Sequence, residues 1–258
     1  MISIEIASVT EIMRSVARGI VLPRFRRLAD GEIREKNPGD LVTIADTEAE
    51  EALTGELLAL LPGSRVVGEE SVAKNPRLLE SLSADGPIWI LDPIDGTGNF
   101  VKGSRKFAMV VALVIGGRTV QGWILDPLPD VVTVAELGGG VWRDGRRLSI
   151  CAEGGIGAMT GSVGPRFRDG LAEAVGALVW QRSAAHDYLG LCGNELQFAY
   201  FHRLHPWDHA AGTLMYAEAG GHGALLSGEA YRPLPGQTGL LLASDRQSWD
   251  ALRPLILC

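Results

Sequence analysis

The sequence predicts a mixed α and β protein whose sheets and helices pack in stacked layers. Three observations support this prediction. Apolar residues in the first 30 positions recur at spacings of three and four, which is typical of a helix with one buried face. Between residues 88 and 150, apolar runs are separated by turn residues, which indicates an antiparallel sheet. After residue 150, short apolar runs alternate with helical segments, which indicates a second layered unit.

The first helix is expected within the first 30 residues. Its apolar positions are Val9, Ile12, Met13, Val16 and Ile20. Pro23 is expected to kink or end this helix, because proline has no backbone N–H and its ring clashes with the preceding turn. The polar residues 31–40 follow and contain Pro38-Gly39, which indicates a turn.

A second helix is expected after a short apolar run at 41–44. Thr47 and Glu50 match a capping box, in which the side chains at the first and fourth positions each accept a backbone N–H of the other. We therefore expect a helix from Thr47 to Leu61, where the following Pro-Gly pair ends it.

An antiparallel meander is expected next. Residues 88–91 read as a buried strand that ends at Asp92-Pro93, because proline cannot donate to a strand ladder. Further strands are predicted at 107–115, 118–125 and 131–137, with a hairpin near 141–150. A short strand is also predicted at 65–67, directly before a pair of glutamates.

The C-terminal part is expected to alternate between strands and helices. The predicted strands are 159–163, 177–181, 196–201, 222–226 and 239–243. The predicted helices are 166–175, 184–192, 208–219 and 245–253. We place a boundary near residue 150 without a linker, so that 1–150 forms an N-terminal α+β half and 151–258 a C-terminal α/β half.

Composition excludes several classes of function. A formal net charge of -7 argues against binding to nucleic-acid polymers or to anionic membrane surfaces. The N-terminus lacks the basic start and clean apolar run of a signal peptide, and no uncharged apolar stretch reaches membrane-spanning length. Cys151, Cys192 and Cys258 are scattered, so we expect reduced thiols and a cytoplasmic protein.

Several carboxylates follow predicted strands or begin predicted helices. Asp92 and Asp95 are three residues apart, so a bend at the strand end would let both face one point. Carboxylate oxygens are ligands that Mg²⁺ prefers. Each position also has a plainer interpretation: a turn at Asp92 and Asp95, an exposed loop at Glu69 and Glu70, and a helix cap at Asp208. The residues alone leave both interpretations open.

Three histidines near the C-terminal end need separate consideration. His202, His205 and His209 are spaced as zinc ligands would be on a helix. Pro206 would interrupt that helix, so we interpret them as structural or surface residues.

Three segments resemble the signature segments of the inositol monophosphatase family: VVGEES, WILDPIDGTGNF and PWDHAAGTLMYAEAGG. The stretch DLVTIAD matches as well, and the order and spacing fit from about residue 30 to residue 225. The resemblance implies a layered α/β/α/β/α sandwich of the inositol monophosphatase and fructose-1,6-bisphosphatase type, assembled as a homodimer. It also implies a Mg²⁺-dependent phosphoric monoester hydrolase that acts on a small phosphate monoester such as inositol monophosphate.

The resemblance further implies two or three Mg²⁺ ions with particular ligands. Glu69, Asp92 and the backbone carbonyl of Ile94 would form the first site. Asp92, Asp95 and Asp208 would form the second. A third and weaker ion would lie near Glu69 and be held through waters.

The resemblance also implies catalytic roles. Asp46 and Thr97 match the pair that orients the attacking water, beside the metal ligands Glu69 and Asp92. The backbone N–H groups of Gly96 and Thr97 would contact the phosphate.

The expected substrate contacts include two departures from the family pattern. Arg182, Ser183 and Ala184 align with a Gly-[Ser/Thr]-Ala loop, so arginine stands where glycine is usual. Phe201 stands where many relatives carry a glutamate that binds substrate hydroxyls, seven residues before the metal aspartate. Asp95 is expected to contact substrate as well.

These departures keep other substrates open. Arg182 would favour a second anionic group, or it is a surface or interface arginine. A 3',5'-bisphosphate nucleotide, fructose 1,6-bisphosphate and histidinol phosphate are the alternative substrates. A non-catalytic metal-binding interaction module is the alternative of another class, and the intact set of acidic residues argues against it.

Overall fold

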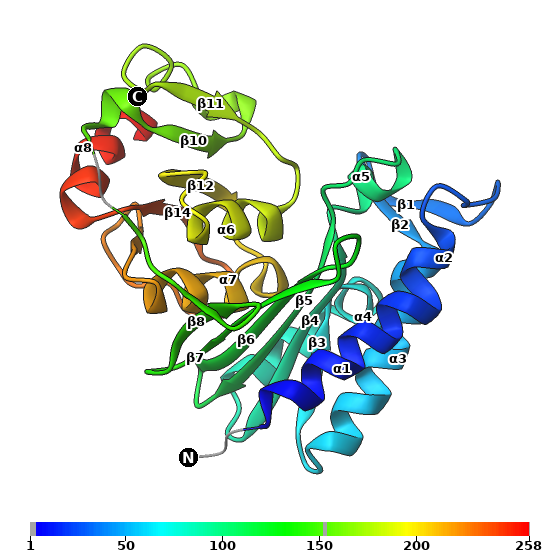
Figure 1. Ribbon diagram of the computed structural model, residues 1–258. Coiled ribbons are helices and arrows are strands. Elements are labelled where there is room, and N and C mark those ends of the chain that lie inside the picture. Colours follow the sequence, from blue (N-terminus) through cyan, green and yellow to red (C-terminus); the bar gives the residue numbers. More distant parts are fainter. Residues whose placement is uncertain (1–3, 152–153, 258) are drawn as a thin grey trace.

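The computed structural model describes residues 4–151 and 154–257, which form five layers (Figure 1). Helices α1 (Ile6–Val16) and α3 (Ile44–Leu60) cover one face of a seven-stranded sheet. Helices α6 (Ala184–Cys192) and α7 (Pro206–Glu218) lie between that sheet and a five-stranded sheet. Helix α8 (Arg246–Leu257) covers the outer face of the second sheet. The predicted α/β/α/β/α layering is confirmed.

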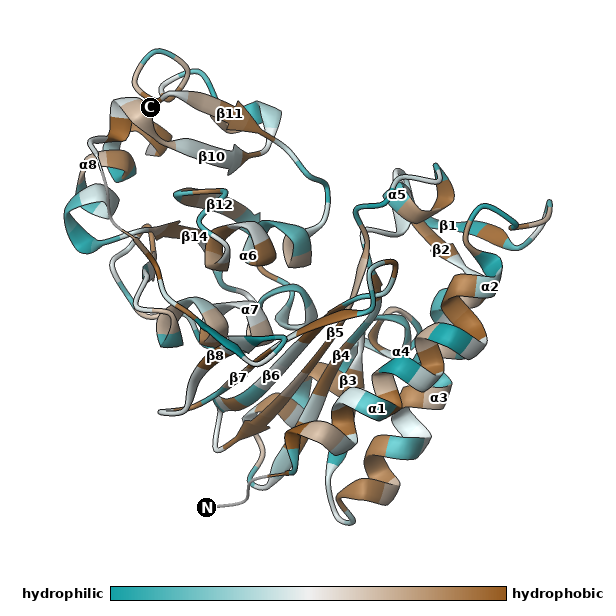
Figure 2. Ribbon diagram, viewed as in Figure 1, coloured by the Kyte–Doolittle hydropathy of each residue, from teal (hydrophilic) through white to brown (hydrophobic). Residues whose placement is uncertain are grey.

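The seven-stranded sheet contains the predicted meander, with strand order β3-β4-β5-β6-β7-β8-β9. Its strands are β3 (Arg65–Gly68), β4 (Pro87–Asp95), β5 (Ala108–Ile115), β6 (Arg118–Asp126), β7 (Val131–Glu136), β8 (Gly140–Arg143) and β9 (Arg146–Leu148). Strand β3 runs parallel to β4, and every other neighbouring pair is antiparallel. Figure 2 shows apolar residues along β4, β5 and β6, which helices cover on both faces and which therefore read as continuous apolar runs.

Strand β4 continues past the point where the sequence predicted its end. It runs to Asp95, and its register with β5 shifts between Asp92 and Asp95. Pro93 lies inside this bulge, where a strand residue needs no ladder hydrogen bond. The bulge is the local feature that places both aspartates at one end of the strand.

The five-stranded sheet has the order β11-β10-β12-β14-β13. Its strands are β10 (Thr160–Val163), β11 (Ala177–Val179), β12 (Phe198–Arg203), β13 (His222–Leu225) and β14 (Thr238–Ala243). All five predicted strands are present. Helix α7 contacts strands of both sheets. The predicted boundary between two halves near residue 150 stays a prediction.

The N-terminal helix continues from α1 through a π-helical segment (Ala17–Val21) into α2 (Leu22–Arg24). It ends one residue after Pro23, as expected. The hairpin of β1 (Ile33–Asn37) and β2 (Asp40–Thr43) follows and was not predicted. Its first strand is mostly exposed and polar, and its second is only four residues long, so it lacks the apolar alternation that indicates a strand.

The predicted capping box at Thr47 and Glu50 is wrong. Thr43 is the N-cap of α3, and its side chain accepts from the Asp46 backbone while Asp46 accepts from the Thr43 backbone. Helix α3 therefore begins at Ile44, and Glu50 lies in its second turn.

The predicted helix at 166–175 is also wrong, because this segment forms a 3-10 turn (Pro165–Phe167) and further turns. Gly170 packs so closely on α8 that a Cβ there would lie 2.3 Å from the Leu255 carbonyl oxygen.

The prediction for α8 was too short, since the helix continues through Pro254. The remaining short helices are α4 (Glu69–Lys74), α5 (Thr97–Val101), Pro76–Ser83 and Ile156–Ala158. None of the described helices is long and apolar enough to cross a membrane.

Candidate active site

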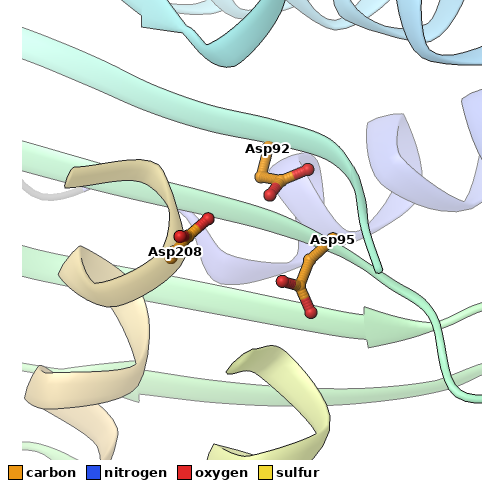
Figure 3. Close-up of side chains that lie close together, drawn as sticks. All are labelled: Asp92, Asp95 and Asp208. Atoms are coloured by element: carbon orange, nitrogen blue, oxygen red, sulfur yellow. The ribbon is translucent and has the colours of Figure 1, made fainter. Parts of the chain in front are cut away.

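Three aspartates from two elements, β4 and α7, converge at the end of β4 (Figure 3). Asp92 precedes the bulge, Asp95 ends the strand, and Asp208 lies in the first turn of α7. One carboxylate oxygen from each residue lies within 4.8 Å of the others. Asp92 is only 1% exposed and Asp95 only 6%, so these charges are largely removed from water.

Burial makes this cluster a strong acceptor of protons or cations. Burial raises the pKa of Asp92 well above its usual range, and the charges of Glu69 and Asp95 raise it further. Burial also raises the pKa of Asp208, with Asp95 and Glu69 as the next causes. Hard carboxylate oxygens at this spacing fit the ligand chemistry of Mg²⁺.

Thr97 connects the end of β4 to α3. Its hydroxyl lies 3.0 Å from Asp46 Oδ1 and 3.1 Å from the Ile94 carbonyl oxygen. The Ile94 N–H donates to Asp92 Oδ1 at 3.0 Å, which keeps Asp92 in place across the bulge. Asp46 is fully buried, and burial raises its pKa to about 6.

Glu69 is the first residue of α4 and lies outside the group of three aspartates. Its carboxylate accepts from Lys36 Nζ at 2.6 Å, and Glu70 accepts from the same nitrogen at 3.0 Å. Burial opposes a charged Lys36, but the two glutamates more than offset it and raise the Lys36 pKa above its usual value. Glu69 is still close enough for its charge to raise the pKa of Asp92 and of Asp208.

Gly96 forms the turn between β4 and α5. Its φ of 86° is a left-handed conformation that glycine adopts without steric cost. A Cβ at this position would lie 2.9 Å from the Lys106 carbonyl oxygen. Asn99, in the next turn, donates to the carbonyl oxygens of Lys106 at 2.7 Å and Gln181 at 2.8 Å. These contacts hold the chain before α6 against α5.

Asp95 also fixes the start of α6. It accepts from the Ser183 hydroxyl and from the backbone N–H groups of Ala184 at 3.1 Å and Ala185 at 2.9 Å. The expected substrate residues Ser183 and Ala184 are thus brought directly beside the aspartate cluster.

Arg182 and Phe201 lie in different surroundings. Arg182 has a φ of 58°, and its guanidinium lies 4.3 Å from the ring centroid of the exposed Trp180. Phe201 is partly buried, and its ring stacks on Tyr188 at 5.5 Å and lies 4.7 Å from His209.

The buried His209 is a structural residue, in agreement with the sequence interpretation. Its Nε2 lies 3.2 Å from the Arg203 carbonyl oxygen, so this nitrogen carries the proton. Its Nδ1 then accepts from the Tyr188 hydroxyl at 3.0 Å. Burial lowers the His209 pKa to about 3, so the ring is neutral.

Sequence reasoning missed three residues that contact the site. Lys36 and Asn99 act through contacts across 33 and 82 residues of sequence, which no local pattern reveals. Glu50 was assigned to the capping box of its own helix, whereas it contacts the first turn of α4. The only signal was its position four residues after Asp46, one turn along the same helix.

Comparisons with known proteins agree with this geometry. The Inositol monophosphatase family model matches residues 5–256. The chain is 34% identical over 233 residues to an inositol-1-monophosphatase of Mycobacterium tuberculosis, which covers 83% of this chain and 77% of that protein. It is 30% identical over 196 residues to a fructose-1,6-bisphosphatase/inositol-1-monophosphatase of Thermotoga maritima, covering 72% and 73% of the two chains. The solved structure of a Thermotoga maritima IMPase superposes with a TM-score of 0.83 at 24% identity, covering 96% and 94%.

Proposed function

The chain belongs to the inositol monophosphatase family of phosphatases, and on that premise we propose that it hydrolyses a small phosphate monoester in a Mg²⁺-dependent reaction. The observation that carries the proposal is the cluster of the buried Asp92 and Asp95 with the partly buried Asp208, in which one carboxylate oxygen from each residue lies within 4.8 Å of the others. A cluster of this charge needs cations before it can accept a phosphate dianion.

We assign the metal ligands as the family pattern implies. Glu69, Asp92 and the Ile94 carbonyl would hold one Mg²⁺, and Asp92, Asp95 and Asp208 a second, with a third held near Glu69 through waters. Bound Mg²⁺ supplies a water of lowered pKa and stabilises negative charge on the phosphate and the leaving oxygen. Lys36 Nζ forms an ion pair with Glu69. When the first Mg²⁺ ion binds, this pair must open, or the Glu69 carboxylate must contact both cations.

The chain's own polar groups would orient the reaction. Thr97 directs its proton to Asp46 or the Ile94 carbonyl, so its oxygen can accept a hydrogen bond from the attacking water. The backbone N–H groups of Gly96 and Thr97 are assigned to the phosphate. Asp95 holds Ser183 and Ala184 beside it.

The substrate class follows from two side chains. Phe201 packs against Tyr188 and His209. Its hydrocarbon ring has no oxygen or nitrogen that could accept a hydrogen bond from a polyol hydroxyl. Arg182 is stacked on Trp180, which weakens the case that it reads a second anionic group. We therefore favour a phosphate ester whose leaving group is less polar than inositol.

A second candidate is a bisphosphate substrate. The Thermotoga maritima relative is described as both a fructose-1,6-bisphosphatase and an inositol-1-monophosphatase, so one family member covers both substrates. A 3',5'-bisphosphate nucleotide and histidinol phosphate are the other alternative substrates.

The activity is tested by phosphate release from an aryl phosphate in EDTA and in millimolar Mg²⁺. We expect turnover only with Mg²⁺, and a loss of at least about 100-fold in Asp92→Asn, or about 2.7 kcal/mol. Mg²⁺ binding without turnover would instead support the non-catalytic module. Turnover in EDTA would contradict the proposal.

The substrate class is tested by kcat/KM for inositol 1-phosphate, an aryl phosphate, fructose 1,6-bisphosphate and a nucleotide 3',5'-bisphosphate. We expect Phe201→Glu to gain about 1–3 kcal/mol of preference for inositol 1-phosphate, because it restores a hydroxyl acceptor. Phe201→Leu is the matched control and should gain none. A wild type that already prefers inositol 1-phosphate by about 100-fold would contradict this assignment.

We also propose a cytoplasmic homodimer. Cys151 and Cys192 are free thiols, which supports a reducing compartment. Strand β11 is an edge of its sheet and exposes Val179 at 37%, followed by Trp180 at 46%, which supports a self-association surface there. Light scattering of wild type and Trp180→Glu tests the dimer, and a monomeric wild type would contradict it.

A further inference from the structure

Glu50 is a buried carboxylate that none of the assigned steps uses. It lies in the second turn of α3 and is 3% exposed. Its Oε2 accepts from the Glu70 N–H at 2.8 Å, and its Oε1 accepts from the Ser71 N–H at 2.7 Å and from the Ser71 hydroxyl. A side chain of one helix thus satisfies the free N–H groups at the start of another.

The start of α4 requires such an external cap. Its N-cap is Gly68, which has an extended backbone (φ -106°, ψ 154°) but no side chain to accept an N–H. Serine, threonine, aspartate and asparagine usually fill this position. A Cβ at Gly68 would lie 2.4 Å from both Cδ and Oε2 of Glu50. Gly68 and Glu50 therefore interlock: the absence of a side chain at one makes room for the carboxylate of the other.

This contact links two parts of the active site through one face of α3. Asp46 and Glu50 are four residues apart and so lie one above the other on the helix. Asp46 contacts Thr97, and Glu50 contacts the first turn of α4, where Glu69 is the first residue. Glu50 thus connects the helix that carries Asp46 to the helical turn that carries Glu69.

We propose that Glu50 is a positioning residue that sets the metal affinity of the site by fixing Glu69 through the first turn of α4, with Gly68 as its necessary partner. The inference rests on the proposed function, because it requires Glu69 to bind metal. It goes beyond that function in assigning a role to two residues that touch neither metal nor substrate.

The arrangement is more than an ordinary helix cap. A serine at position 68 would satisfy α4 locally, without a second buried carboxylate. Glu50 instead adds negative charge beside Glu70, whose pKa is already raised by burial and by Glu69. What the carboxylate adds is a rigid connection between α3 and α4, so the two helices hold Asp46 and Glu69 in a constant relation.

The test is Mn²⁺ binding, measured by the EPR signal of the free aqueous ion, in wild type, Glu50→Ala, Glu50→Gln and Glu50→Ala/Gly68→Ser. The double variant uses the space that the carboxylate leaves and places a hydroxyl at the N-cap, where it can accept the Ser71 N–H. Asp245→Ala is the matched control, since Asp245 caps α8 through the Ser248 N–H at 2.7 Å, on the outer layer of the molecule. Melting temperature is measured for each variant in EDTA.

We expect Glu50→Ala to weaken Mn²⁺ binding about 10-fold, the lower end of the effect of groups that orient metal ligands from outside the coordination shell. Glu50→Gln keeps one acceptor and should lose less. Asp245→Ala should lower the melting temperature without changing Mn²⁺ affinity. The double variant should recover the melting temperature but stay within about threefold of the Mn²⁺ affinity of Glu50→Ala, because the serine restores the cap of α4 without the connection to α3.

Two results would overturn the inference: wild-type Mn²⁺ affinity in Glu50→Ala, or a double variant that regains the affinity together with the melting temperature, which would leave Glu50 as an ordinary helix cap. If Glu50→Ala does not fold, unchanged affinity in Glu50→Gln overturns it instead. A wild type that binds no Mn²⁺ would show that the proposed function itself is wrong, and this result needs no variant.

Discussion

Thr97 has two acceptors for its one hydroxyl proton, Asp46 Oδ1 at 3.0 Å and the Ile94 carbonyl at 3.1 Å. With its proton directed inward, the threonine oxygen is left to accept from a water. In the proposed reaction, this hydroxyl would stabilise the transition state more than the bound substrate. Its removal should therefore affect the chemical step.

We expect Thr97→Ala to lower kcat about 100-fold or more while KM changes by less than about threefold. Thr97→Ser is the matched control, because it keeps the hydroxyl and should stay within about tenfold of wild type. Steady-state kinetics at saturating Mg²⁺ makes the comparison. Equal kcat values in the two variants would show that Thr97 serves only the turn.

Arg182 provides a second prediction, about stability. Its left-handed φ of 58° costs a residue with a side chain about 1–2 kcal/mol, which glycine avoids. Arg182→Ala loses the contact with Trp180 and keeps the strain, whereas Arg182→Gly loses the contact and relieves it. We expect the glycine variant to be the more stable by about 1 kcal/mol in urea unfolding. The opposite order would mean that the strain is not present.

The residues of the site were predictable to the extent that they lie in short contiguous segments. Asp92, Asp95 and Asp208 stand in two such segments, and the structure brings them together. Lys36 and Glu50 could not be predicted from pattern, because each acts on α4 from a distant part of the sequence. A lysine in a polar hairpin and a glutamate within a helix are also common as exposed residues.

At the scale of elements, the hairpin of β1 and β2 is the part of the site with the fewest buried residues. It carries Lys36, which pairs with Glu69 at 2.6 Å and Glu70 at 3.0 Å and lies 3.7 Å from Asp40. If Glu69 binds metal as proposed, this ammonium group would compete with the ion for the oxygens of Glu69.

We expect Lys36→Met to tighten Mg²⁺ binding in the absence of substrate by about tenfold, equivalent to 1.4 kcal/mol. The substitution removes the ammonium group, and with it the positive charge that would repel the ion. Lys36→Arg is the control and should bind Mg²⁺ as weakly as wild type or more weakly. Calorimetric titration gives both affinities, and weaker binding by Lys36→Met would show that the lysine supports the metal site instead of competing with it.

Helices and strands were predicted best where burial determines the pattern of apolar residues. The continuous apolar runs of β4, β5 and β6 come from helices on both faces, and Ala184–Cys192 matches the expected helix at both ends. Errors occurred where tertiary contacts override local preference. Gly170 meets the Leu255 carbonyl instead of forming a helix, and Thr43 takes the capping role that the pattern assigned to Thr47.

At the scale of the whole molecule, the site lies where the two sheets approach each other around α7. Asp92 and Asp95 come from the seven-stranded sheet, and Asp208 comes from a helix that packs on both sheets. The repulsion among these carboxylates therefore acts on the packing between the layers, and metal binding should be visible in global stability.

The last prediction concerns pH and Mg²⁺ together. Burial raises the pKa of Asp46 to about 6, and burial and Glu69 raise that of Glu70 to about 7, while the pKa values of Asp92 and Asp208 are also raised. At these groups the native state binds protons more tightly than the unfolded chain does. The stability that they contribute is therefore greatest below about pH 4, and this contribution is lost as pH rises to about 7. His209, with a pKa lowered to about 3, acts in the opposite sense below about pH 6.5, but it is a single group.

The measurement is therefore the difference in melting temperature between millimolar Mg²⁺ and EDTA, which isolates the effect of the metal at each pH. We expect this difference to grow as pH rises from about 4 to about 7, because metal replaces protons that the carboxylates release. At a Mg²⁺ concentration of 100 times Kd the stabilisation is about 2.7 kcal/mol, or about 5–10 °C for a chain of this size. Asp92→Asn should flatten the dependence on both Mg²⁺ and pH. A wild type with the same melting temperature in Mg²⁺ and EDTA at pH 7 would contradict a preformed metal site, since an ion that binds only the native state must stabilise it.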